Sequence, residues 1–241
     1  MFKTKILFSI ITIVLFQRYI PAVFAQSNTE KGNVVAIVLS EKIFAGELEP
    51  TGNLKQHLVG LSKEEYDARS QEIRLAMLKA RITQPLMKIF CQDHQCEPAA
   101  DEIAVFHKAM QSFPDQDKSA ASLTKEQREK AEEVKRNKEH GMVYMWKFNK
   151  ALYGAYAGGL RLRYIGLEPI GAYKKWLREN EANNKFQILD PKLKAKFWEY
   201  FENAGSHVMS SEDIDKFCKD NGMKHPFDKP VRLIVKGTPK G

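Results

Sequence analysis

One long amphipathic segment constrains the fold of this chain more than any other feature. Ser62 and Glu65 form a capping box, in which each side chain bonds the other residue's free backbone amide at a helix start. The helix that follows is predicted to run for up to about 28 residues, with a kink at Pro85. Its second half is apolar on two faces, so it must be covered on both sides and is the best candidate for the core. These faces consist of Ile73, Met77, Ala80 and Met87, and of Leu75, Leu78, Ile82, Leu86 and Ile89.

Helix-start signals recur along the rest of the chain. Glu97-Pro98 begins a predicted helix that places Phe106 and His107 on one apolar face. Thr124 and Gln127 form a second capping box, and the helix after it is charged over residues 125–140 but rich in aromatic side chains over 142–156. Further helices are predicted after Glu168-Pro169, Asp190-Pro191 and Ser210-Ser211-Glu212. The sequence therefore predicts a mainly α fold.

The strand signals are few and short. Val34 to Leu39 is a continuous run rich in β-branched residues that predicts a buried strand, followed by a return strand at Ile43-Phe44. Val231 to Val235 is a comparable run near the other end of the chain. Since a buried strand needs hydrogen-bonding partners, we expect these N- and C-terminal strands to form one small β-sheet. Alternating Leu and Arg residues from Leu160 predict one more short, half-buried strand.

Residues 1–25 have the layout of a secretory signal peptide. Lys3 and Lys5 precede an apolar run from Ile6 to Phe16. The segment Ala22-Val23-Phe24-Ala25 then places small or β-branched residues at the positions that a signal peptidase reads, with a predicted cleavage after Ala25. The run of about eleven residues is shorter than the roughly twenty that span a membrane. We therefore expect export to the periplasm or beyond the cell, with an uncleaved N-terminal anchor as the alternative.

The charge of the mature chain is mild. The formal net charge of the whole chain is +8, and three of its basic residues, Lys3, Lys5 and Arg18, lie in the predicted leader, which leaves +5. Lys and Glu are interleaved instead of forming the basic face typical of nucleic-acid binding. We expect no nucleic-acid partner. No second apolar stretch reaches membrane length, so the mature protein is also expected to have no stable membrane span.

Three cysteines remain after the leader. Cys91 and Cys96 flank a four-residue loop, and in an oxidising compartment such a pair favours a disulfide between the end of one helix and the start of the next. A bridge to Cys218 and a metal site that includes His94 are the alternatives, although zinc sites usually have four ligands. With the first pairing, Cys218 stays a free, buried thiol.

The sequence contains no motif that would identify an enzyme. It has no phosphate-binding glycine loop, no nucleophile-elbow serine and no zinc-protease helix. His107 lies on an apolar face, where a packed core histidine is expected. Glu168 and Asp190 could work as a pair of carboxylates, but each precedes a proline at a helix start, where an acid stabilises the helix end. We assign no catalytic residue, cofactor or metal.

Aromatic residues crowd the C-terminal half, and they could fill a core or line a groove for apolar or peptide ligands. Methionines on the kinked helix would suit an adaptable binding surface, or could fill the core. The residues that we assign to a peptide-binding surface are Met77, Met87, Trp146, Tyr153, Tyr164, Trp176 and Trp198.

The segments VVAIVLSEKIFAGELE and QEIRLAMLKARITQPLMKIFCQDHQCEPAADEIAVFHKAM follow the export signal in order. This layout resembles the N-terminal chaperone domain of the SurA-type periplasmic folding factors over residues 33–111. It departs from that family at the turn, where Asn with a nearby Gly is common and this chain has Leu39-Ser40. Family members typically continue into a parvulin prolyl-isomerase domain, which nothing after Phe113 resembles; the 158–204 segment stands there instead.

The sequence predicts a signal peptide (1–25), a SurA-like helical module (26–111), a linker (112–123) and an aromatic-rich helical region (124–241) whose C-terminal strand returns to the first module. The resemblance implies a non-catalytic, chaperone-like or peptide-binding protein whose partners are unfolded or extended polypeptides, including outer-membrane proteins. The alternatives are an exported enzyme, either a degenerate prolyl isomerase or a hydrolase, and an assembly subunit that docks through its charged helix.

Overall fold

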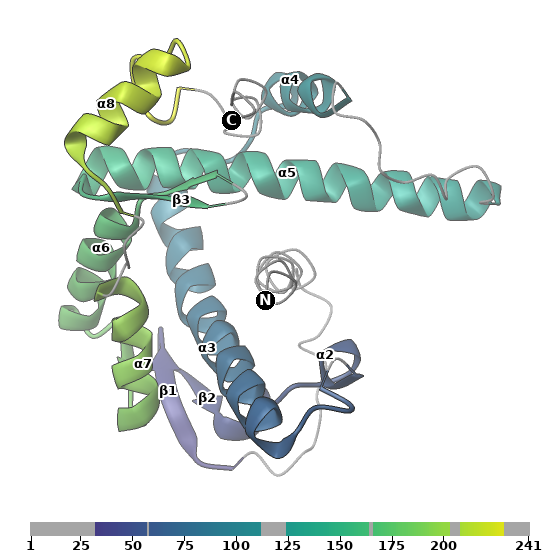
Figure 1. Ribbon diagram of the computed structural model, residues 1–241, viewed down its shortest axis with the longest axis vertical. Coiled ribbons are helices and arrows are strands. Elements are labelled where there is room, and N and C mark those ends of the chain that lie inside the picture. The colour runs from purple at the N-terminus through teal and green to yellow at the C-terminus, as the bar shows by residue number, and fades with distance from the viewer. Residues whose placement is uncertain (1–31, 57, 112–123, 164–165, 203–207, 229–241) are drawn as a thin grey trace. The chain divides into compact units, whose positions relative to one another are not determined.

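The computed structural model describes residues 32–56, 58–111, 124–163, 166–202 and 208–228, and this part of the chain is mainly helical, as predicted (Figure 1). Its helices are α2 (Asn53–Gln56), α3 (Lys63–Asp93), α4 (Ala100–Gln111), α5 (Lys125–Tyr156), α6 (Ile170–Ala182), α7 (Pro191–Glu202) and α8 (Ser211–Asp220), with a 3₁₀ turn at Ala45–Leu48. None of these helices is both long and apolar enough to cross a membrane.

The chain forms two compact units that interleave along the sequence. The first comprises Met1–Phe90 and Lys174–Asn203, and the second comprises Cys91–Tyr173 and Ala204–Gly241. Two of the three boundaries thus fall inside α3 and α6. The predicted division lay at 112–123, which is outside the described residues along with the predicted leader. Residues 174–203 belong to the first unit because they supply a strand and a helix to it.

A three-stranded antiparallel sheet organises the first unit. Its strands are β1 (Val34–Val38), β2 (Glu41–Phe44) and β5 (Phe186–Ile188), in the order β2-β1-β5. The predicted hairpin is confirmed: Val38 pairs with Glu41 across a two-residue turn in which Leu39 and Ser40 both have positive φ. On the other edge of β1, Ala36 pairs with Ile188.

The partner of β1 therefore differs from the one expected. The run 231–235 lies outside the described residues, and both edges of β1 already have partners, in β2 and β5. The direct pairing of β1 with 231–235 is thus wrong. The backbone carbonyl of Val35 also accepts hydrogen bonds from the amides of Leu189 (2.8 Å) and Asp190 (3.2 Å). The three residues of β5 supply the backbone hydrogen bonds that we had expected β1 to receive from the C-terminal run.

Helix α3 begins where its capping box predicts. The Ser62 amide donates to Glu65 Oε2 (3.1 Å), and the Glu65 amide donates to Ser62 Oγ (3.3 Å). The helix continues through Pro85 to Asp93. Most of its two predicted apolar faces are buried, although Ile89 is exposed. The fully or nearly fully buried side chains of this unit include Ile43, Leu48, Leu78, Ile82, Leu86, Phe186 and Phe197.

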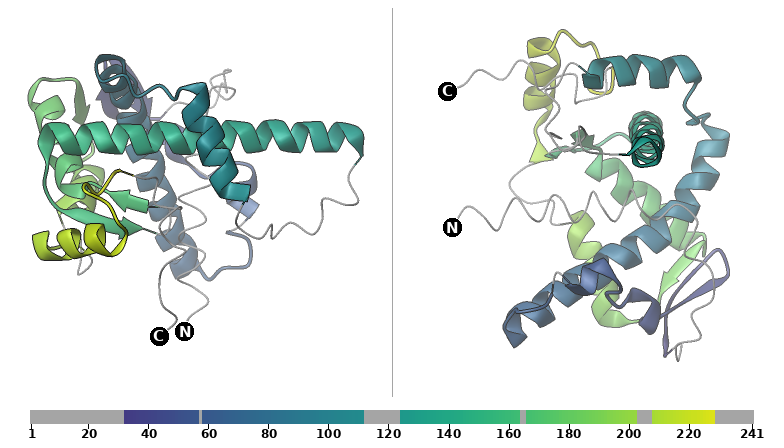
Figure 2. Two further views of the ribbon diagram at one scale, coloured as in Figure 1. Left: turned by 90° about the horizontal axis from the view of Figure 1, so that it is seen from above. Right: turned by 90° about the vertical axis from the view of Figure 1, so that its right-hand side faces the viewer.

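The second unit is built on α5, against which α4 lies (Figures 1 and 2). The Thr124–Gln127 capping box is confirmed at its start. Residues 125–138 are exposed except for the half-buried Lys135, as the charged sequence predicts, but Glu139 is buried. A second sheet joins β3 (Leu160–Arg163), β4 (Gly166–Glu168) and β6 (Val208–Met209) in the order β4-β3-β6.

A close backbone approach fixes the start of α6 in the second unit. The Gly171 amide donates to the Gly159 carbonyl (3.0 Å), and a Cβ built on Gly171 would lie 2.6 Å from the Gly159 nitrogen. Gly158 has φ +116°, a conformation that residues with side chains rarely adopt. Only residues without a side chain let the two segments come this close.

We predict that Gly171→Ala lowers the free energy of unfolding by about 2 kcal/mol, because the added methyl group overpacks this contact. Gly154 in α5 is a matched control, since a Cβ built there has no described atom within 4 Å apart from its chain neighbours and the nearby backbone of its own helix. Gly154→Ala should raise the free energy of unfolding by about 0.5–1 kcal/mol, the usual gain for a helix interior. Urea unfolding measures both. Equal effects of the two substitutions would contradict the close approach.

Candidate functional site

The residues assigned to a peptide-binding surface lie in both units and differ in burial. Met77, Trp176 and Trp198 are buried in the first unit, where Met87 is half-buried. Trp198 packs against Phe197, with ring centroids 5.3 Å apart, and the Arg178 guanidinium stacks over its ring at 3.5 Å. Such side chains contact a ligand only if the core rearranges. Tyr164 lies outside the described residues.

Trp146 and Tyr153 are half-buried on α5 in the second unit. Both pack against a cluster formed by Leu160, Leu167 and Phe227. The Tyr153 ring lies 5.5 Å from the Phe227 ring, and Trp146 Nε1 is buried with no hydrogen-bond partner among the described residues. A buried donor of this kind usually has an acceptor. The Nε1 atom of Trp198 in the first unit is likewise buried with no hydrogen-bond partner among the described residues.

Three apolar side chains that are close together in the sequence, Val59, Leu61 and Tyr66, are exposed, and the sequence reasoning missed them. Val59 is 80% exposed, Tyr66 40% and Leu61 37%, and all three lie at or just before the start of α3. Helix α2 ends at Gln56, so Val59 and Leu61 lie between α2 and α3. The sequence did contain a signal for this exposure, because these residues lie within a few positions of the polar first turns of the long helix.

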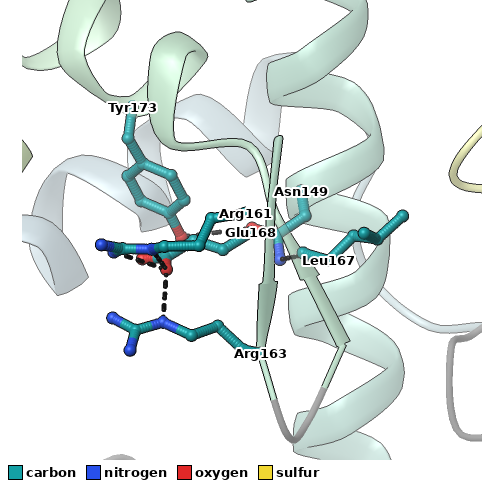
Figure 3. A network of polar contacts seen from close by, with 6 residues as sticks. All are labelled: Asn149, Arg161, Arg163, Leu167, Glu168 and Tyr173. Carbon is teal, nitrogen blue, oxygen red and sulfur yellow. Dashed lines mark hydrogen bonds and ion pairs between the residues drawn. The ribbon is translucent and has the colours of Figure 1, made fainter. Parts of the chain in front are cut away.

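We had expected Glu168 to stabilise the start of a helix. Its carboxylate instead joins two arginines (Figure 3). Its Oε2 atom accepts hydrogen bonds from Arg161 Nε (3.0 Å), Arg161 Nη2 (2.7 Å) and Arg163 Nε (2.9 Å). Arg161 and Glu168 are direct neighbours across β3 and β4. This pairing buries Arg161 and leaves Leu162 51% exposed. Strand β3 is half-buried as predicted, but Arg161 lies on its buried side because its carboxylate partner, Glu168, lies on the same side of β4.

Asn149 on α5 extends this network. Its Oδ1 accepts a hydrogen bond from the Tyr173 hydroxyl (3.2 Å), and its Nδ2 donates to the Leu167 carbonyl (3.4 Å), as Figure 3 shows. The side chain therefore links α5 to β4 and to the first turn of α6. Asp190, the other acid of the considered pair, lies in the first unit and caps α7 as predicted, since its Oδ1 accepts from the Leu193 amide (2.9 Å).

The charges around Glu168 keep it ionised. Burial acts to raise the pKa of this carboxyl, but the positive charges of Arg161 and Arg163 and their hydrogen bonds outweigh burial, and the pKa lies below its ordinary value. A carboxyl group with a lowered pKa is a poor general acid at neutral pH. The arrangement is therefore suited to fixing the β3–β4 hairpin.

We predict that Glu168→Gln lowers the free energy of unfolding by about 2–3 kcal/mol at neutral pH, because Arg161 stays buried without its anionic partner. The loss should shrink in acid. The lowered pKa means that the stabilisation is complete above the ordinary carboxyl pKa and disappears as the pH falls through the native value. Urea unfolding at several pH values measures this difference.

Arg163→Gln is the matched control, since Arg163 is 41% exposed and pairs with the same oxygen. Its cost should not exceed about 1 kcal/mol. If Glu168→Gln cost as much in acid as at neutral pH, ionisation of Glu168 would not be the source of the stability.

The contact between α4 and α5 is polar and rich in histidine. His107 was expected to be a packed core residue, but it is only half-buried, and its Nδ1 lies 2.9 Å from Oε2 of the buried Glu139. His140 Nε2 lies 3.1 Å from Glu97 Oε1. Lys147 Nζ donates to the Glu97 carbonyl and to Glu102 Oε2, both at 2.8 Å. The polar side chains of α5 therefore become buried from Glu139 onward, where α4 packs against α5.

Cys91 and Cys96 are free, buried thiols whose side chains are in hydrogen-bond contact with one another. Cys218 is also free and buried. Burial raises the pKa of all three thiols, and raises that of Cys96 to about 12. His94 is exposed, and no three His, Cys, Asp or Glu side chains of the described residues could hold a metal ion together. No disulfide joins Cys91 to Cys96 in the structure, where we had expected one.

The chain was compared with known protein families, with curated proteins and with solved structures, and none of them matches it.

Proposed function

We propose that this protein is an exported, non-catalytic, chaperone-like protein that binds unfolded or extended polypeptide. The observation that carries this proposal is the exposure of Val59, Leu61 and Tyr66 in the first unit, and we treat the part of the chain that bears them as one surface. Isolated exposed apolar residues are normal on a protein surface, but a group of them is typical of an interaction site. Here three occur within eight residues of sequence, next to helical turns that are themselves exposed.

The surroundings of this surface suit a polypeptide chain better than a small molecule. Residues 62–68 at the start of α3 are all exposed and carry both acidic and basic side chains. An unfolded polypeptide offers apolar side chains that can cover Val59 and Tyr66, and charged side chains that can pair at the edges. The export signal and the SurA-like layout of residues 33–111 support the same proposal and suggest unfolded outer-membrane proteins as clients.

The test is an aggregation assay with an unfolded outer-membrane protein followed by light scattering. Protein isolated from the exported fraction, whose mass should correspond to a chain that begins at Gln26, should slow aggregation at a few-fold molar excess. The double variant Val59→Ser, Tyr66→Ser should need about tenfold more protein, because it loses the burial of two apolar side chains. Absence of any effect of the native protein on aggregation would overturn the proposal.

Leu189→Ser supplies the matched control. Leu189 is 43% exposed in the first unit, and it lies just after β5 instead of near the start of α3. This variant should protect the client as well as the native protein does. Equal losses in the control and in the double variant would mean that exposed apolar residues in general, and not this surface, bind the client.

One observation favours a second candidate, an assembly subunit that docks through α5. Residues 125–138 are exposed except for the half-buried Lys135, and Val134 is 60% exposed among charged neighbours. This end of α5 extends past α4 (Figure 2). In a pull-down from the exported fraction, Val134→Lys should remove a partner that docks on this helix, while the Val59→Ser, Tyr66→Ser variant should retain that partner.

A further inference from the structure

The spacing of Cys91 and Cys96 has a geometric reason at the end of α3. The helix ends at Asp93, Gln95 has a φ of +51°, and the Cys96 amide donates to the Cys91 carbonyl (3.2 Å). This pattern is a Schellman motif, in which a residue with positive φ turns the chain back on the last helical turn. The motif brings together the side chains of the two residues that share this hydrogen bond, and the contact is usually between apolar groups. In this protein it is between two thiols.

Tyr144 of α5 adds a third group and makes the pair unequal. The Cys91 side chain is in hydrogen-bond contact with both the Cys96 thiol and the Tyr144 hydroxyl. Burial raises the pKa of Cys91, and these two hydrogen bonds oppose it. At Cys96 burial raises the pKa to about 12, and the hydrogen bond to Cys91 adds to the effect. Cys91 therefore holds negative charge more easily than Cys96.

The two cysteines also differ in exposure, and Cys91 is again the more accessible to reaction. Cys91 is 6% exposed and Cys96 is 1% exposed, while the four residues between them, 92–95, are exposed. Both thiols therefore lie directly beside an exposed turn at the end of α3. Exposed helix ends and turns open locally more readily than a core does, and a reagent reaches a buried thiol through such opening.

We propose that Cys91 and Cys96 are a thiol–disulfide site, in which Cys91 reacts first with a small disulfide, Cys96 closes the intramolecular bridge, and Tyr144 positions the Cys91 sulfur. The Cys91 thiolate attacks one sulfur of the small disulfide, which forms a mixed disulfide and releases one small thiolate. The Cys96 thiolate then attacks the Cys91 sulfur and releases the second small thiolate. Two protein thiols are oxidised to one disulfide, the small disulfide is reduced to two thiols, and the two protons pass to the released thiolates.

The first test is a redox titration of the full chain. The protein is equilibrated in buffers of oxidised and reduced glutathione, the remaining thiols are alkylated in denaturant, and the peptides are identified by mass spectrometry. Cys91 and Cys96 should lose their reactivity together, with one bridge joining their peptides, while Cys218 stays alkylated. A stable glutathione adduct on Cys91, or full alkylation of both cysteines in the most oxidising buffer, would overturn the proposal.

The second test concerns Tyr144. In a Cys96→Ser background, the rate at which Cys91 of the folded protein reacts with iodoacetamide is followed as a function of pH. Loss of the hydrogen bond in Tyr144→Phe should move the profile upward by about one pH unit, since a hydrogen bond to a charged group contributes about that much. Tyr200→Phe, which changes a half-buried tyrosine on α7 of the first unit, should leave the profile unchanged.

A purely structural role of Tyr144 would lower the melting temperature without moving this pH profile, and that result would remove Tyr144 from the proposal. The reaction of the cysteine pair does not depend on polypeptide binding. A failed aggregation assay and a failed redox titration are therefore separate outcomes.

Discussion

Strand β1 has hydrogen-bonded partners on both edges, and the first unit depends on this arrangement. Its residues are too apolar to remain exposed and too few to fold alone. One partner, β2, follows directly in the sequence, but the other, β5, lies far along the chain between α6 and α7. Because β5 must reach β1, residues 174–203 belong to the same compact unit as the N-terminal strands. The interleaved division of the chain follows from one short strand pairing.

The parts of the fold that were predictable from the sequence depend on local interactions. The capping boxes at Ser62 and Thr124, and the cap of α8 at Ser210, involve residues three positions apart, and the structure contains all three. The β1–β2 hairpin is local in the same sense. The pairing with β5 was missed because Phe186–Ile188 is only three residues long, and its role is decided by a distant partner. A longer β-branched run at 231–235 was the stronger signal, but pattern strength does not decide which strands pair.

The candidate sites show the same limit. Alternation of Leu and Arg in β3 predicted a half-buried strand, but it could not show that Arg161 is the buried side, since this depends on Glu168 across the hairpin. The spacing of Cys91 and Cys96 predicted a disulfide, whereas the structure has two free thiols on either side of a local turn. Tyr144 could not be connected with this pair from sequence, since it comes from a different helix. Exposure of Val59 and Tyr66 was missed because it depends on which neighbouring segments cover them in the folded unit.

The turn at Leu39-Ser40 has a consequence for the order in which the chain folds. Both residues have positive φ, which costs about 1–2 kcal/mol for each residue that has a side chain. A hairpin with this turn is therefore weak on its own. In the folded unit the turn is held from outside, because the Leu39 amide donates a hydrogen bond to the Lys185 carbonyl (2.8 Å). The N-terminal strands therefore gain a lasting structure only after residues 185–188 have been synthesised and have reached them. Until then an apolar strand with an unpaired edge is present, and a nascent chain in this state has the same properties as the unfolded polypeptides that chaperones bind.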